Sequence, residues 1–227
     1  MKAPEILKEL ESQANPDAVE GMARFGITPE KTFGAPLPFM RQLAKRVGKN
    51  HSLAQELWSM GIRETRIVAT LIDDPEQVTE EQMETWALDF SYWEICDQCI
   101  TNLFSWPGFA YEKAEEWSGR KEEFVKRAGF VMMARLAVIR KKEPDKYFES
   151  FLPIIENEST DDRKNVKKAV DWALRQIGKK NLHLNKKAIA AVKRIQKKDS
   201  RAAKWIASDA LRELASEKVQ ERVKKKG

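Results

Sequence analysis

The residues whose types and spacing could carry chemistry lie in one short segment, from Ser91 to Asp97. Trp93 and Asp97 are four positions apart, so on a helix their side chains share one face, one turn from each other. A tryptophan ring attracts a cation through its quadrupole, and a carboxylate stabilises positive charge that develops during a reaction. The pair therefore predicts a site for a cationic substrate. Trp172, further along the chain, could supply a second, facing ring.

The same residues also have a structural interpretation. A tryptophan in a helical protein most often packs in the core, and this chain has seven of them. Asp97 has apolar neighbours on both sides, so its charge needs either a function or a cationic partner. Arg127 is the partner that we expect. The two interpretations differ in what removal of the Asp97 charge would cost, activity in the first and stability in the second.

A metal or redox site is not expected. Cys96 and Cys99 form a C-x-x-C pair, but a zinc site needs two more ligands, and the only histidines, His51 and His183, lie far away in the sequence. A redox pair of the thioredoxin type would need a strand–helix–strand context, which the sequence lacks. We expect both cysteines to be buried apolar residues in a reducing compartment, with no metal and no cofactor.

Helical periodicity runs through nearly the whole chain, with apolar residues three or four positions apart and no alternating strand pattern. Short segments rich in glycine and proline interrupt it, and N-cap patterns follow at Thr79 and Ser159. The pattern predicts about twelve to fourteen helices in a single domain over residues 1–227.

A repeat of about 40 residues is visible within this helical pattern. Each copy has an apolar residue followed by a basic one early in a helix, in Val125–Ala128, Val166–Ala169 and Ala203–Ile206, with a fainter copy in Thr65–Ala69. Such repeats are typical of HEAT and armadillo proteins, whose stacked helix pairs form a curved solenoid. We therefore predict an all-α, right-handed superhelical solenoid with a concave basic face.

Equivalent positions of such repeats line up along the concave face. One basic residue of each repeat would then form a ladder of cations for a polyanion, made by Arg66, Arg127, Lys168 and Lys204. The alternative is that each of these cations pairs locally with a carboxylate.

Charge is distributed unevenly along the chain, whose formal net charge is +6. Residues 161–227 carry 21 lysines and arginines against 8 acidic residues, whereas the preceding 160 residues carry 20 against 27. This asymmetry favours a surface that faces a polyanion, although lysine-rich solvated helix faces would give the same numbers. No apolar run is long enough to cross a bilayer, and the first residues lack the apolar segment of a signal peptide, so we expect a cytoplasmic protein with no membrane partner.

Four segments, in this order and rough spacing, resemble the AlkD-like alkylpurine DNA glycosylases of the DNA alkylation repair family: Met22–Phe25, Tyr92–Asp97, Lys126–Ala128 and Lys168–Arg175. The resemblance covers nearly the whole chain. It implies a catalytic Asp97, substrate-binding walls formed by Trp93 and Trp172, and an Arg127 that contacts the DNA backbone.

The resemblance also bears on Phe25 and Tyr92, where the chain differs from the family. Phe25 stands where the family commonly has tyrosine, so one hydroxyl that could reach a phosphate is missing, and Tyr92 stands where it often has a second tryptophan. Further contacts to the DNA backbone are expected from Arg66, Lys168, Arg175 and Lys204.

The function implied is excision of positively charged N3- or N7-alkylated purines from duplex DNA by a monomeric enzyme, in a family that acts without flipping the base. Two alternatives stay open. One is a HEAT-repeat protein that binds damaged or branched DNA without catalysis, from which Asp97 distinguishes the enzyme. The other is a protein–protein scaffold, which would not need the basic half of the chain. Activity on RNA is a further possibility.

Overall fold

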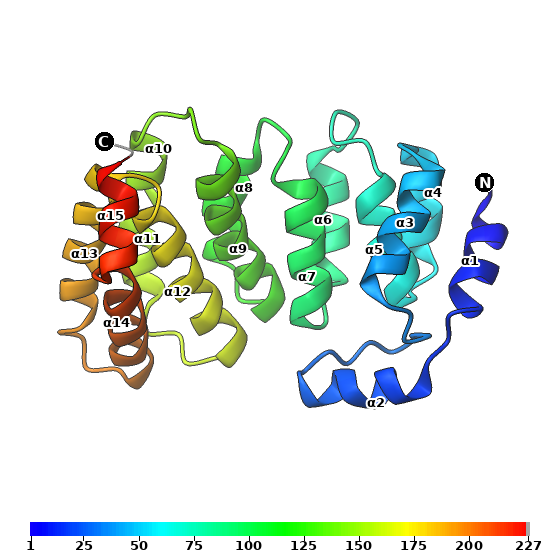
Figure 1. Cartoon of the computed structure of the whole chain (residues 1–227), viewed down its shortest axis with the longest axis horizontal. Helices are drawn as coiled ribbons and strands as arrows, with labels where there is room; N and C mark the ends of the chain where they lie inside the picture. Colours follow the sequence, from blue (N-terminus) through cyan, green and yellow to red (C-terminus); the bar gives the residue numbers. More distant parts are fainter. Residues whose placement is uncertain (226–227) are drawn as a thin grey trace. The chain divides into compact units, whose positions relative to one another are not determined.

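The computed structural model describes residues 1–225, so residues 226 and 227, the last two of the expected single domain, lie outside the described part. The described residues form fifteen α-helices and one π-helical segment, with one isolated bridge, between Lys31 and Ile62, and no strand (Figure 1). The expectation of an all-α fold is therefore confirmed. The chain divides into two compact units, Met1–Pro107 and Gly108–Gly227, and each is described by itself. A single domain over the whole chain stays a prediction.

The first unit is organised around α5, which contacts α1, α3, α4, α7 and the π-helical segment. Apolar residues such as Ile67 and Val68 are fully buried along α5, because the helix has neighbours on several sides. The elements of this unit are α1 (Ala3–Glu11), α2 (Pro16–Arg24), α3 (Leu37–Val47), α4 (His51–Ser59), α5 (Arg63–Ile72), α6 (Glu80–Leu88), α7 (Trp93–Cys99) and the π-helical segment η1 (Ile100–Phe104).

The second unit is organised around α12, which packs against both α9 and α14 (Figure 1). Each of these three helices also packs on a second helix, α9 on α8, α12 on α11 and α13, and α14 on α13. This is the helix-pair arrangement that the repeats predict. The elements of this unit are α8 (Ala110–Ser118), α9 (Glu123–Ile139), α10 (Lys146–Glu149), α11 (Phe151–Glu158), α12 (Lys164–Gly178), α13 (Leu182–Ile195), α14 (Arg201–Leu214) and α15 (Glu217–Lys224).

A glycine allows α8 and α9 to pack closely. A Cβ atom added at Gly129 would lie 2.5 Å from the backbone nitrogen of Ser118 and 2.9 Å from the carbonyl oxygen of Ala114. Any side chain at this position would therefore separate the two helices.

The sequence predicts two helix N-caps, at Thr79 and Ser159, and the structure confirms only the first. Thr79 caps α6 as expected, because its hydroxyl accepts a hydrogen bond from the backbone nitrogen of Gln82 at 3.1 Å. The expected cap at Ser159 is wrong: Ser159 ends α11, and α12 begins only at Lys164. The connecting segment is held instead by Asp161, whose carboxylate accepts from the backbone nitrogen of Arg163 at 3.1 Å.

Burial defines the register of the repeat more sharply than charge does. Val125 and Ala128 of α9 correspond to Val166 and Ala169 of α12, as predicted. Between α12 and α14 the alignment differs by one residue, since the buried positions Val166, Ala169, Val170, Ala173 and Ile177 repeat as Ala203, Ile206, Ala207, Ala210 and Leu214. Lys204 therefore corresponds to Lys167, and the position of Lys168 is occupied in α14 by Trp205. The expected pairing of Lys168 with Lys204 matched charges rather than buried faces.

None of the helices within residues 1–225 combines the length and the apolar character that crossing a membrane would require.

Candidate functional site

Trp93 is the first residue of α7, and a long-range hydrogen bond fixes its ring. Its indole Nε1 donates to the backbone carbonyl of Phe25, 2.9 Å away and 68 positions earlier in the sequence. Phe25 ends α2, and its side chain is 75% exposed. The chain turns away at Gly26, whose φ of 74° favours glycine. Phe25 and Trp93, which were each predicted to be site residues, are thus in contact in the first unit.

A buried ion pair fixes the start of α7 beside Trp93. The guanidinium of Arg63 donates two hydrogen bonds of 2.7 Å to the two carboxylate oxygens of Glu94. Both side chains are buried. Burial alone would lower the pKa of Arg63, but the hydrogen bonds and charges of Glu94 and Glu64 raise it above its ordinary value. Arg63 therefore stays ionised, and this fork geometry gives α7 a defined position relative to α5.

The neighbouring residue, Glu64, fixes the segment that follows α2. Its buried carboxylate accepts from the backbone nitrogens of Phe33 and Gly34, at 3.0 and 3.1 Å, and from the hydroxyl of Thr32 at 2.8 Å. Gly34 is required here, because it has a φ of 79° and an added Cβ would lie 2.3 Å from the carbonyl oxygen of Asn15. Arg63 also donates to Glu64 at 2.9 Å. One buried cluster, Arg63, Glu64 and Glu94, therefore supports both segments that meet at Trp93.

Sequence reasoning missed this cluster. Its signal was present as an adjacent arginine and glutamate, Arg63 and Glu64, at the start of a helix, and as Glu94 inside the Ser91–Asp97 segment. Nothing in the sequence shows that these charges are buried or that they meet.

Asp97 lies on α7 one turn after Trp93, as predicted, and its side chain is partly exposed. Cys96 and Cys99, on either side of it, are free and buried, and burial raises the pKa of the Cys99 thiol well above its ordinary value, so Cys99 is not a nucleophile. The helix continues directly into the π-helical segment η1, a form of backbone that is frequent at functional sites. Asp97 is thus the accessible acid of this helix, since Glu94 is buried in its ion pair with Arg63.

The second unit holds the remaining nominated residues. Arg127 of α9 is buried, and its guanidinium donates to the backbone carbonyl of Asn165 in α12 at 2.7 Å. Trp172 of α12 is half-buried, and the exposed Lys168 lies four positions before it. Lys168 and Trp172 therefore share one helix face. How these residues act together with Trp93 and Asp97 of the first unit stays a prediction.

Two of the expected DNA-backbone contacts are arginines with carboxylate partners. Arg66 pairs with Asp89 at 3.1 Å, and its guanidinium carbon lies 5.1 Å from the centre of the Trp58 ring. Arg175 lies among three carboxylates, Asp171 at 2.9 Å, Glu213 at 2.5 Å and Asp209 at 3.7 Å. Both arginines therefore have carboxylate partners in the structure, and a contact of either with the DNA backbone stays a prediction.

The expected lysines differ from the arginines. Lys204 and its partner Asp199 are both exposed, with 3.2 Å between the ammonium and the carboxylate, so their pairing is weak. Lys168 is exposed and has no ion-pair partner within residues 1–225. These two residues, unlike Arg66 and Arg175, present charge to solvent.

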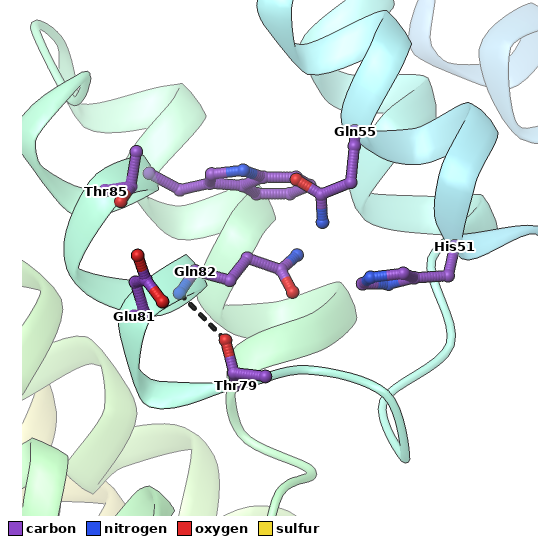
Figure 2. A pocket seen from close by; sticks show the side chains of 7 residues that line it. His51, Gln55, Thr79, Glu81, Gln82 and Thr85 are labelled. Atoms are coloured by element: carbon purple, nitrogen blue, oxygen red, sulfur yellow. Dashed lines mark hydrogen bonds between the residues drawn. The ribbon is translucent and has the colours of Figure 1, made fainter.

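A separate pocket of about 280 Å³ lies between α4 and α6 of the first unit. Figure 2 shows His51 and Gln82 pointing toward each other across it. His51 Nδ1 lies 2.7 Å from one oxygen of the buried Asp73, and Gln82 Nε2 donates to the other oxygen at 2.6 Å. These bonds tie α4 and α6 to the end of α5. We interpret the pocket as the surface of a structural contact between helices, because the His51 imidazole and the Gln82 amide both bind Asp73.

The family described as "DNA alkylation repair enzyme" matches residues 6–214. A solved structure described as "a new family of proteins related to the HEAT-like repeat DNA glycosylases with affinity for branched DNA structures" is similar with a TM-score of 0.78 and 19% identity, over 93% of this chain and 95% of that one. A designed armadillo repeat protein aligns with a TM-score of 0.37 and 16% identity, over 77% of this chain and 91% of that one. None of the curated proteins matches the sequence.

The likeness to the first of these structures shows the fold, which is that of the HEAT-like repeat proteins related to DNA glycosylases. The family match extends over both compact units and includes every residue nominated above. The chain therefore belongs to the DNA alkylation repair enzyme family.

Proposed function

We propose that the protein is a DNA N-glycosylase, which hydrolyses the N-glycosidic bond of N3- or N7-alkylated purines in duplex DNA. The observation that carries this proposal is the arrangement at the start of α7, where a fixed tryptophan, Trp93, is followed one turn later by the partly exposed Asp97. A ring for a cation and a carboxylate for a developing cation are the two elements that this reaction needs.

The chemistry of the lesion explains why so few groups suffice. Alkylation at N3 or N7 makes the purine cationic, so its glycosidic bond is weakened and the base leaves as a neutral molecule. Protonation of the leaving group, which other glycoside hydrolases supply with a second acid, is not required. What remains is to stabilise positive charge on the sugar and to orient a water, and a single ionised carboxylate, Asp97, serves both purposes.

The orientation of Trp93 suits a stacking or cation–π role. Its N–H donates to the Phe25 carbonyl in the plane of the ring, so the hydrogen bond uses the edge of the indole and neither of its faces. A cationic nucleotide beside one face would gain about 1–2 kcal/mol if the contact is shielded from water. Trp172 supplies a second ring in this proposal, and Arg127 a contact to the same DNA backbone.

Affinity for the duplex comes mainly from lysines in this proposal. Lys168 and Lys204 are exposed and therefore available to phosphates, which contribute binding energy independent of base sequence. In this proposal Arg66 and Arg175 contribute little to DNA affinity, because their carboxylate partners already neutralise them.

The decisive experiment measures release of free base from duplex DNA that contains N7-methylguanine. Asp97→Asn is nearly isosteric, and we expect it to cut excision by about 100-fold or more while the fold and DNA binding persist, because one preorganised charge is lost. Asp74→Asn is a matched control, since it also removes a partly exposed carboxylate of the first unit, one that lies outside α7 and bonds to Gln77.

A melting curve recorded beside the activity separates catalysis from structure. If Asp97 only balances the charge of a buried Arg127, its neutralisation would cost about 3–5 kcal/mol of stability. A well-folded Asp97→Asn protein with undiminished excision would remove Asp97 from the mechanism.

A second candidate function is recognition of branched DNA without excision. The affinity for branched DNA that the similar solved structure's family has favours it. The same protein preparation distinguishes the two functions. No release of free base, together with tighter binding to a three-way junction than to a duplex of equal length, would support the second.

A further inference from the structure

One large aromatic side chain is exposed among lysines in the second unit. Trp205 of α14 is 40% exposed, and the ammonium of Lys167 in α12 lies 4.8 Å from the centre of its ring. Lys204, the preceding residue, is also exposed. No other aromatic ring within residues 1–225 stacks on Trp205. The ring is therefore held from one helix and open to solvent.

Trp205 lies on the helix face that the repeat assigns to ligand contact. It occupies the position in α14 that Lys168 occupies in α12, and Lys168 shares its face with Trp172. Arg201, also exposed, is four positions before Trp205 and so lies on the same face one turn earlier. The exposed Lys164 has the same relation to Lys168. The face shared by α12 and α14 thus carries a tryptophan with cations around it.

Acidic groups near Trp205 do not cancel these cations. Asp209, one turn further along α14, is paired with Arg212 and lies 3.7 Å from Arg175. Asp199, which is fully exposed, pairs with Lys204, whose side chain is 60% exposed. The surroundings of the ring therefore remain positive, which fits an anion with a flat apolar part and does not fit a basic peptide.

We infer that Trp205 is a stacking site for an unpaired DNA base, with Lys167, Lys168 and Lys204 binding the phosphates on either side of it. A paired base presents only its edges in the grooves, whereas an unpaired base at a flap or branch exposes the flat face that a tryptophan binds. The inference rests on the DNA-binding part of the proposed function and adds a feature of the substrate, a base outside the duplex. It does not depend on Asp97.

The test compares two undamaged DNAs, a duplex with an unpaired flap of about ten nucleotides and a fully paired duplex of the same length. Dissociation constants are measured by fluorescence anisotropy at one fixed salt concentration. Trp205→Ala should weaken binding to the flap by about 5- to 150-fold, the range for loss of one base–aromatic stack, and change binding to the paired duplex little. Trp205→Phe should retain most of the preference for the flap.

Tyr147→Ala is the matched control. Tyr147 is also 40% exposed and also has a lysine over its ring, Lys146 at 5.2 Å, but it lies on the short helix α10. The Tyr147→Ala variant should have the same two dissociation constants as the wild-type protein. If Trp205→Ala does not fold, Trp205→Leu replaces it, and 2-aminopurine in the flap gives a signal from the wild-type protein, because stacking on tryptophan quenches its emission.

Three outcomes overturn the inference: equal losses on both DNAs, no loss on the flap, or unquenched 2-aminopurine in the bound complex. Each is distinguishable from failure of the proposed function. If wild-type protein binds neither DNA, the proposed function fails as well. If it binds DNA and excises alkylated bases while Trp205→Ala has no effect, only the stacking site is wrong.

Discussion

The two units are both built from packed helices but use their charged residues in different ways. In the first unit, arginines and carboxylates are buried in pairs, as in the cluster of Arg63, Glu64 and Glu94. In the second unit many lysines stay in solvent, including Lys168 and Lys204, although the buried Arg127 and the Asp171–Arg175 pair occur there as well. One repeat architecture therefore contains buried ion pairs that hold helices in defined positions and exposed lysines that present their charge to solvent. Charge buried with its partners fixes geometry, whereas exposed charge acts on ligands.

The largest effect is expected at the buried cluster. Arg63→Met would leave the buried Glu94 and Glu64 without their cation, and we expect a loss of about 3–5 kcal/mol in the free energy of unfolding, measured in urea. Lys168→Met, in the second unit, removes one exposed cation and should change stability by less than about 0.5 kcal/mol. Similar losses of unfolding free energy in the two variants would contradict this difference between the units.

A buried acid of the second unit gives a pH-dependent effect. Burial raises the pKa of Asp171 to about 7, and the charge of Asp209 adds to this, against the opposing effect of Arg175. Between about pH 4 and pH 7, folded Asp171 holds a proton that the unfolded chain has released, so its contribution to stability falls as pH rises, by at most about 4 kcal/mol.

Asp171→Asn cannot titrate, so it removes this contribution. The free energy of unfolding of the variant minus that of wild type should therefore increase from pH 4 to pH 7 and level off above. Equilibrium unfolding at several pH values measures it. A difference that does not change with pH would show that Asp171 is ionised throughout.

Charge reversal of the exposed lysines should affect binding and spare stability. Lys168→Glu and Lys204→Glu should each weaken binding to duplex DNA by about the same factor for all sequences. Each should also reduce the slope of log affinity against log salt by about 1 or more, since one phosphate contact is lost. Titrations at several salt concentrations measure both effects. Binding that is indifferent to salt and to both reversals would instead favour a protein–protein scaffold.

The smallest effect is expected at Phe25. Because its ring is 75% exposed, Phe25→Tyr should not change stability, but it adds a hydroxyl that can donate to a phosphate. We expect binding to duplex DNA to tighten by about two- to tenfold, the equivalent of one net hydrogen bond. Phe25→Ala is the companion variant. Loss of affinity in Phe25→Ala with no gain in Phe25→Tyr would mean that the ring acts by packing alone.

Several features followed from the sequence because they depend on local spacing. Helix content, the shared face of Trp93 and Asp97 and the apolar pattern within α9 and within α12 all follow from residues within a few turns of one another. The burial of Cys96 and Cys99 was also predicted, since apolar neighbours surround them in the sequence. Periods of 3.6 residues and caps such as Thr79 are properties of a single helix, so they can be read without the rest of the fold.

Only the tertiary structure decided which charges meet and which remain in solvent. Three sets of contacts join residues far apart in the sequence: the bond from Trp93 to the Phe25 carbonyl, the Arg63–Glu94 pair, and the contacts of Arg175 with Asp209 and Glu213. The place of Trp205 opposite Lys167 likewise depends on how α14 packs on α12. Arginines and lysines look alike in a charge count, but a charge is neutralised or free according to the long-range packing around it, and that packing is set by the burial of apolar faces.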